Sequence, residues 1–135
     1  MRNIILLILF IITFVNANSL NWTKGVKNGL EKAQKEHKIL MIFVEAKHCP
    51  WCHKMLNTTL SDKDVVRNLN KNYILVKVDA DSKEGREYFP NISITPTTFF
   101  STGDKQILEE IDGYNNVEFF FWSMAKAEKK FKEIK

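Results

Sequence analysis

Two cysteines stand three positions apart in the run Cys49-Pro50-Trp51-Cys52, and the chain has no others. A disulfide between them would close a loop of only four residues, which constrains the unfolded chain so little that the pair suits exchange better than structural support. Pro50 is favoured in the first turn of a helix. Backbone N–H groups and the helix dipole stabilise a thiolate there, and in such motifs the pKa of the first cysteine falls to between about 3.5 and 7.5. We therefore expect Cys49 to be an exposed nucleophile and Cys52, one turn further in, to be the shielded resolving cysteine.

The same residues fit two other kinds of site. Cys49, Cys52 and His53 match C-x-x-C-H, the attachment motif of a c-type haem, which also needs a second axial ligand, typically from Met or His. A metal-binding module would use the same three residues together with His48, and these ligands suit zinc or copper(I). However, six consecutive residues cannot easily wrap four ligands tetrahedrally around one ion, and predicted strands around the motif are unlike a small helical cytochrome. We therefore expect no metal and no cofactor, and we interpret His48 and His53 as modulators that add positive charge near the thiolate.

Apolar periodicity predicts the elements that position the cysteine pair. Continuous apolar runs of strand length predict buried strands, and the turn cluster Ser101–Asp104 joins the last two into a hairpin. The predicted strands cover residues 39–44, 73–78, 97–100 and 106–111. The predicted helices cover residues 22–36, 50–57, 61–70 and 82–88, followed by a terminal helix capped by Asn115 or Asn116, with Glu118 at the third position if Asn115 is the cap. The alternation indicates an α/β fold with a central mixed sheet and helices on both faces.

The N-terminal residues have the layout of a cleavable export signal. Arg2 precedes an apolar run of 12 residues, Ile4–Val15, and Ala17 stands at the predicted cleavage site. A membrane span needs about 20 residues, so the run is short for one, although an uncleaved anchor stays an alternative. We predict a signal peptide over residues 1–17 and a single domain over residues 18–135, located in a bacterial periplasm or secreted.

The basic excess of the chain does not indicate a nucleic-acid partner. The formal net charge is +4, and the excess gathers near the C-terminus at Lys126, Lys129, Lys130, Lys132 and Lys135. Lysines in the last turns of a helix favour its negative end and stay solvated, and no face interleaves them with aromatic residues. We expect a monomer that binds no nucleic acid.

The sequence resembles the thioredoxin family. A predicted strand ends in Val44-Glu45-Ala46, the cysteine pair opens the next helix, and Ser93-Ile94-Thr95-Pro96-Thr97 leads into the closing hairpin. Gly113 matches the family's glycine before the last helix. The resemblance covers roughly Trp22 to the C-terminus. It is strongest to extracytoplasmic thioredoxin-like proteins and to the C-terminal domain of transmembrane thiol:disulfide reductases.

The resemblance implies a fold, an activity and a substrate-binding surface. It implies a thioredoxin fold and a thiol:disulfide oxidoreductase that reduces protein disulfides, with a possible membrane electron donor. It also implies that Thr95–Pro96 is a cis peptide bond facing the sulfurs. In this family the residue before that proline pairs its backbone with an extended substrate, so Thr95 and Pro96 are candidate substrate-binding residues.

Three positions leave open what surrounds the sulfurs. Many thioredoxins carry a buried aspartate six residues before the first cysteine, where this chain has Phe43. Glu45 lies on the same side of the strand and is the nearest carboxylate, either as a substitute or as a solvated group at the strand end. Trp51 either offers an apolar plane to a substrate or packs into the core.

Overall fold

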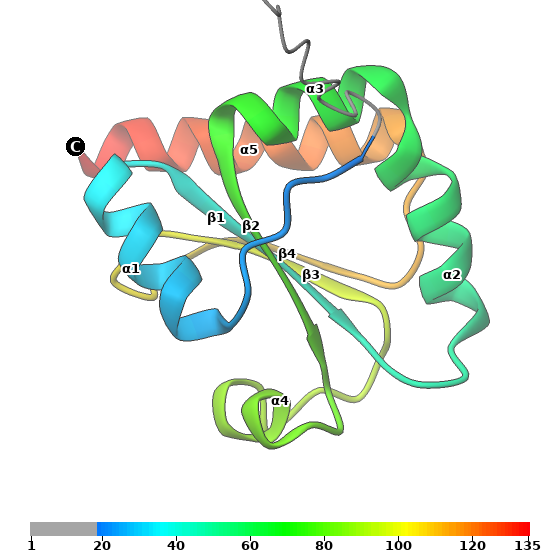
Figure 1. Ribbon diagram of the computed structural model, residues 1–135. Coiled ribbons are helices and arrows are strands. Elements are labelled where there is room, and N and C mark those ends of the chain that lie inside the picture. Colours follow the sequence, from blue (N-terminus) through cyan, green and yellow to red (C-terminus); the bar gives the residue numbers. More distant parts are fainter. Residues whose placement is uncertain (1–18) are drawn as a thin grey trace, which may run out of the picture.

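The computed structural model describes residues 19–135, which form alternating helices and strands (Figure 1). The helices are α1 (Val26–Glu36), α2 (Pro50–Asn57), a single 3₁₀ turn (Thr59–Ser61), α3 (Lys63–Asn72), α4 (Lys83–Tyr88) and α5 (Val117–Ile134). The strands are β1 (Ile39–Glu45), β2 (Tyr73–Asp79), β3 (Thr97–Ser101) and β4 (Ile107–Asp112). The predicted signal peptide lies outside the described residues. Among the described residues, no helix is both long and apolar enough to cross a membrane.

The four strands form one mixed sheet in the order β2-β1-β3-β4. β1 and β2 are parallel, and β3 runs antiparallel to both β1 and β4. This arrangement confirms the predicted mixed sheet with a closing hairpin. It also brings the C-terminal end of β1 next to the N-terminal end of β3, because Val44 pairs with Thr97.

Each face of the sheet is covered by its own apolar cluster. Met41 and Phe43 of β1 face α2, α3 and α5, whereas Leu40, Ile42 and Val44 face α1 and the end of α4 (Figure 1). Alternate side chains of a strand point to opposite faces, so a strand covered on both sides must be apolar throughout. β1 is therefore apolar along its whole length because helices cover both faces of the sheet.

The first helix is shorter than its amphipathic pattern predicts. Trp22 forms a parallel bridge with Leu75 of β2, and the Thr23 N–H donates to the Leu75 carbonyl at 2.7 Å. The chain then turns at Gly25, whose φ of 89° is favourable only for glycine, and the helix begins at Val26. The prediction of a helix from residue 22 is wrong because a tertiary strand contact holds Trp22 extended.

The cap of the last helix is Asn116. Its side-chain oxygen accepts the Phe119 N–H at 2.9 Å, so Glu118 is not at the third helical position. Asn115 instead donates from Nδ2 to the Gly113 carbonyl at 3.0 Å. Of the two caps that the sequence left open, the structure selects the second, because Asn115 is used by the turn that precedes the helix.

Candidate active site

Cys49 and Cys52 form a disulfide at the N-terminus of α2, with their Cα atoms 5.3 Å apart. Cys49 is the N-cap residue, and its Sγ accepts the Cys52 N–H at 3.2 Å. Pro50 occupies the first helical turn, as the sequence predicts. The sulfur of Cys49 thus lies where unpaired N–H groups and the positive end of the helix dipole meet.

Neither cysteine is widely open to solvent. Cys49 is 7% exposed and Cys52 is 1% exposed, and both belong to the apolar cluster that includes Met55 and Phe43. Cys49 is therefore less exposed than predicted, because Thr95 comes within hydrogen-bonding distance of its sulfur. The order of exposure still leaves Cys49 as the more accessible of the two.

The loop before β3 lies against the sulfurs. The Thr95 hydroxyl donates to Cys49 Sγ at 3.4 Å across 46 residues of chain. The Thr95–Pro96 peptide bond is cis. The Pro96 carbonyl accepts the Gly113 N–H at 2.7 Å, which attaches the loop after β4 to the same place. The sheet order explains why the loop before β3 contacts both the start of α2 and the loop after β4, since β3 lies between β1 and β4.

Trp51 is the most exposed of the apolar side chains around the disulfide. Its side chain is 55% exposed, so the core-packing interpretation is wrong. Its ring lies 5.9 Å from that of Tyr114, and the Lys54 ammonium lies over both rings, 4.9 Å from the Trp51 centroid and 4.6 Å from the Tyr114 centroid. Hydrogen bonding from Thr58 lowers the pKa of Tyr114, and the positive charge of Lys54 acts in the same direction.

The sequence analysis missed Lys54 and Tyr114 as site residues. Lys54 follows Trp51 by one helical turn, which is a detectable spacing. Tyr114 lies 60 positions further along the chain, and only the pairing of β4 with β3 brings it to α2. Its position directly after Gly113 is the one signal that could have found it.

The two histidines and Glu45 lie to one side of the disulfide. His48, His53, Lys47, Glu45 and Asp79 line a shared pocket of about 400 Å³. His48 has a φ of 58°, in the left-handed region, at the turn between β1 and α2. Glu45 is partly buried, and its carboxylate lies 4.0 Å from the Lys77 ammonium on the neighbouring strand. Within residues 19–135, no group of three or more His, Cys, Asp or Glu side chains is arranged to hold a metal ion.

Apolar groups take the place of a buried carboxylate beneath the sulfurs. Phe43 is fully buried in the same cluster as Cys52. Thr98 stands opposite it in the β1–β3 register, and its buried hydroxyl has no hydrogen-bond partner among the described residues. Phe43 therefore places an aromatic ring in this cluster where many thioredoxins have the aspartate.

Taken together, these contacts make a site suited to thiol chemistry. The backbone and Thr95 offer hydrogen bonds to Cys49, while Cys52 is held one helical turn away in contact with the core. The four-stranded sheet around the pair also differs from the helical fold that a small c-type cytochrome would have. The geometry favours dithiol exchange over the two alternatives that the motif allowed.

Comparison with known proteins places the chain among thioredoxin-like proteins. Residues 11–102 match the family model of the thioredoxin-like DsbH proteins, described as "Protein of unknown function, DUF255". Spermatogenesis-associated protein 20 of Mus musculus is 32% identical over 66 residues, which cover 49% of this chain and only 8% of that protein. The match thus concerns a small part of the mouse protein.

Several solved structures have the same fold. A thioredoxin from Thermus thermophilus is 26% identical with a TM-score of 0.69, covering 86% of this chain and 87% of that chain. A DsbH oxidoreductase is 17% identical with a TM-score of 0.68, covering 82% and 85%. The oxidised C-terminal domain of Neisseria meningitidis DsbD is 22% identical with a TM-score of 0.61, covering 74% and 91%. The chain therefore belongs to the thioredoxin-like DsbH family, DUF255, and has the thioredoxin fold with the Cys-x-x-Cys pair of a thiol–disulfide oxidoreductase.

Proposed function

We propose that this chain is an exported oxidoreductase that reduces disulfides of periplasmic proteins through Cys49 and Cys52. The observation that carries the proposal is the cysteine pair at the N-terminus of α2, with the Thr95 hydroxyl 3.4 Å from Cys49 Sγ. A thiolate at that sulfur would accept hydrogen bonds from both the helix backbone and Thr95, and hydrogen bonds to the charged form favour it.

The exchange conserves electrons between the two cysteine pairs. In the reduced protein, the Cys49 thiolate attacks one sulfur of the substrate disulfide and releases the other as a thiolate, leaving a mixed disulfide. The Cys52 thiolate then attacks the Cys49 sulfur, and the substrate leaves as a dithiol. Two electrons pass from the protein to the substrate, so a further dithiol must reduce the Cys49–Cys52 disulfide before the next turnover. A membrane electron donor is the partner we propose for that step.

Substrate contacts are proposed for three residues that surround Cys49. Trp51 offers an exposed indole, and the chain at Thr95 and Pro96 is continuous with β3 and next to the sulfur. Glu45, His48 and His53 are proposed as modulators, since they line the pocket beside the pair. An extended substrate segment would pass between these two groups and bring its disulfide to Cys49.

The direction of exchange is proposed to be reduction. The resemblance of the sequence to the C-terminal domain of transmembrane thiol:disulfide reductases supports this direction. The described elements also follow one another without an inserted helical subdomain that would form a broad groove for unfolded chains. Equilibration of the purified protein with glutathione tests the proposal, because a reductase should have a potential near about −270 mV and a strong oxidant near about −120 mV. A value at the oxidant end would overturn the assignment as a reductase while leaving the cysteine pair as the exchanging group.

Export rests on residues 1–17 and is tested separately. Expression of the full chain in a bacterium should yield a periplasmic protein that begins at residue 18, as read by N-terminal sequencing. A full-length protein retained in the membrane fraction would favour the anchor instead, and a full-length cytoplasmic protein would contradict both.

A further inference from the structure

The Lys54 ammonium lies over two neighbouring aromatic rings at the start of α2. Its Nζ lies 4.9 Å from the Trp51 centroid and 4.6 Å from the Tyr114 centroid, within the distance of about 6 Å at which a ring face attracts a cation. Trp51 and Lys54 are three residues apart on α2 and so lie on the same side of the helix. Lys54 is exposed, so its ammonium lies over the two rings and stays open to solvent. We call Trp51, Lys54 and Tyr114 the aromatic clamp.

The loop that carries Tyr114 is fastened at both ends. The Gly113 N–H donates to the Pro96 carbonyl at 2.7 Å, and the Thr59 hydroxyl donates to the Asn115 carbonyl at 2.5 Å. One bond leads to the loop that contacts Cys49 and the other to the turn after α2. Because these contacts order the clamp in advance, a partner need not spend binding energy on ordering it.

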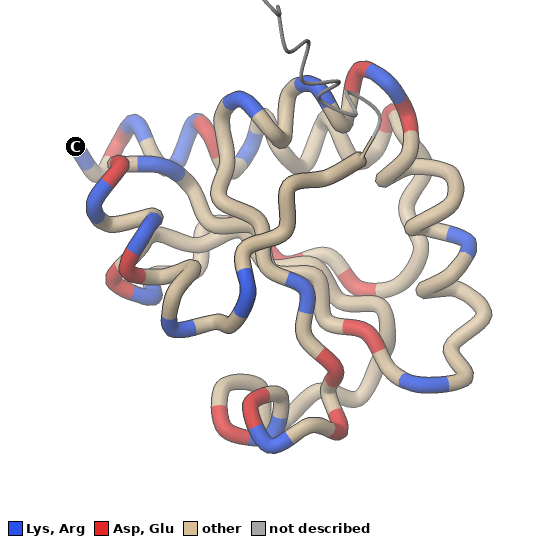
Figure 2. The backbone as a smooth tube through the Cα atoms, in the orientation of Figure 1, with Lys and Arg blue, Asp and Glu red and all other residues tan. Residues whose placement is uncertain are grey.

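The clamp carries an uncompensated positive charge. Residues 46–61, which include the cysteine pair and all of α2, contain Lys47 and Lys54 but no Asp or Glu. Figure 2 shows this stretch marked in blue without red. Within the described part of the chain, Lys54 forms no salt bridge, whereas Lys77, Lys126 and Lys130 are each paired with a glutamate.

Two carboxylates of neighbouring strands have other partners. Glu45 is paired with Lys77 at 4.0 Å and faces the histidine pocket together with Asp79. Asp112 accepts the Thr97 hydroxyl at 3.2 Å. Because Lys54 is exposed and pairs with no carboxylate of the described residues, its ammonium is available to a group that a partner brings.

We propose that the aromatic clamp selects protein disulfides that carry a carboxylate side chain next to the reacting cysteine. The proposal rests on the proposed function, because it assigns a substrate class to the same site. An Asp or Glu of the substrate would contact Lys54, while neighbouring apolar atoms would cover the exposed face of Trp51. Complementary charge at the edge of an interface mainly increases the rate of association, and salt screens it.

The test compares two peptide disulfides that differ only in having Glu or Lys beside the reacting cysteine. The reduced full-length protein is mixed with each peptide at low ionic strength, and kcat/KM is measured for both. The wild-type chain should prefer the Glu peptide by about 1.5- to fivefold, the range expected for an exposed ion pair. The preference should shrink towards one at about 1 M salt, where charges are screened within about 3 Å.

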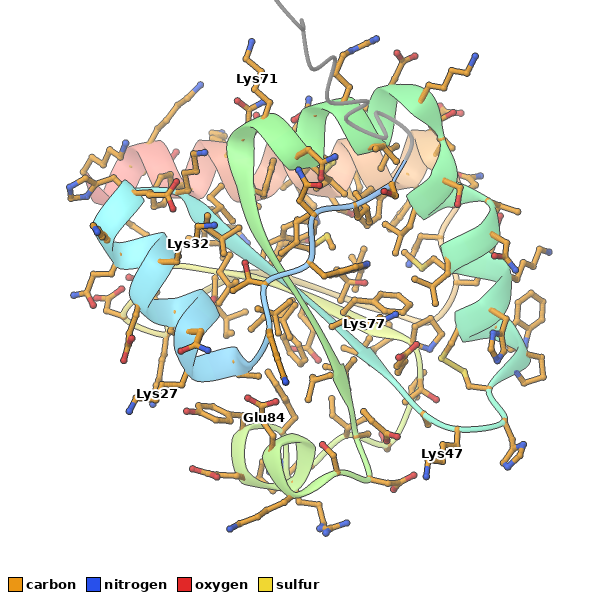
Figure 3. The ribbon with its side chains drawn as sticks, in the orientation of Figure 1. Lys27, Lys32, Lys47, Lys71, Lys77 and Glu84 are labelled. Carbon is orange, nitrogen blue, oxygen red and sulfur yellow. A yellow bond between two sulfur atoms is a disulfide. The ribbon has the colours of Figure 1, made fainter. Side chains whose placement is uncertain are left out.

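Variants distinguish an effect of the aromatic clamp from an effect of the net charge of the protein. Lys54→Gln should bring the ratio of the two rates close to one, whereas Lys54→Arg should keep it, because guanidinium also stacks on aromatic rings. Tyr114→Leu should lower the ratio and Tyr114→Phe should preserve it. Lys71→Gln is the matched control, since it removes the same charge from an exposed lysine that points away from the body of the molecule on α3 (Figure 3), and it should leave the ratio unchanged.

Each outcome decides the proposal. Equal rates for the two peptides in the wild-type chain, or an unchanged ratio in either Lys54→Gln or Tyr114→Leu, would overturn the clamp while leaving the oxidoreductase in place. An equal loss in Lys71→Gln would show that only net charge matters and would also overturn it. Failure to reduce either peptide would refute the proposed function and the inference with it.

Discussion

Cys49 receives hydrogen bonds from two parts of the chain that are far apart in sequence. The Cys52 N–H comes from its own helix, and the Thr95 hydroxyl comes from the loop before β3. Both would stabilise negative charge on the sulfur when the disulfide is reduced, because hydrogen bonds to the ionised form favour it. The reactivity of Cys49 should therefore depend on a residue outside the motif.

Thr95→Val tests this dependence at the scale of one residue. The variant keeps the shape of the side chain but loses the hydroxyl, so a smaller fraction of Cys49 should be ionised near neutral pH. Alkylation of the reduced protein by iodoacetamide should slow severalfold at pH 7, and Thr95→Ser should behave like the wild type. Equal alkylation rates in all three proteins would show that the Thr95 contact has no part in activating the thiol.

The sequence predicts the cysteine pair and the Thr95–Pro96 loop but not the whole site. The pair is recognisable because its chemistry requires a fixed spacing at a helix start. The clamp is not recognisable, because Tyr114 meets Lys54 only through the pairing of β3 with β4. The low exposure of Cys49 likewise depends on a contact that spans 46 residues.

At the scale of elements, α5 depends on one side chain for its start. The Asn116 oxygen accepts the Phe119 N–H at 2.9 Å, and Phe120 and Met124 of the same helix are buried against the sheet. Asn116→Ala should lower the free energy of unfolding by about 1 kcal/mol, the usual effect of removing such a cap. Asn116→Ser should keep nearly all of the stability in urea denaturation. Equal stability of all three proteins would contradict the cap.

A second link joins α5 to the sheet through charge. Glu109 of β4 is largely buried and accepts hydrogen bonds from Lys126 and Lys130, the latter at 3.1 Å. Burial acts to raise the pKa of Glu109, but the two lysines outweigh it and hold the pKa below the usual value.

The sign of this shift predicts how stability depends on pH. A carboxylate with a lowered pKa stabilises the fold above its unfolded-state pKa, about 4.3, and loses that contribution as the pH falls through the folded-state value. The wild-type chain should therefore lose more stability than Glu109→Gln between about pH 6 and pH 3. Glu110→Gln, an exposed neighbour with the same charge change, should follow the wild-type curve. Parallel curves for wild type and Glu109→Gln would contradict the coupling.

Elements were predictable where the local pattern decides them and not where a distant contact does. The apolar run of β1 and the proline at the start of α2 specify both elements, and their observed bounds agree with the prediction to within one residue. Trp22 has helical spacing relative to Val26, yet its bridge to Leu75 keeps it extended. The choice between Asn115 and Asn116 depended in the same way on a turn that the sequence does not display.

At the scale of the whole molecule, the sheet order creates the site. β1 and β3 are neighbours and antiparallel, so the start of α2 and the loop before β3 meet where β1 ends and β3 begins (Figure 1). The buried sides of Cys52 and Met55 belong to the larger apolar cluster, which fixes α2 on the sheet. A rigid support of this kind leaves Cys49 as the more accessible of the two cysteines.

The central claim is that Cys49 attacks and Cys52 resolves. Its most direct test is to incubate reduced Cys52→Ser and reduced Cys49→Ser with a protein that carries an accessible disulfide, and to separate the products on a non-reducing gel. Cys52→Ser should accumulate a mixed disulfide that mass spectrometry maps to Cys49, because nothing remains to resolve it. Cys49→Ser should form little adduct, since Cys52 is 1% exposed. Equal or greater trapping by Cys49→Ser would contradict the account.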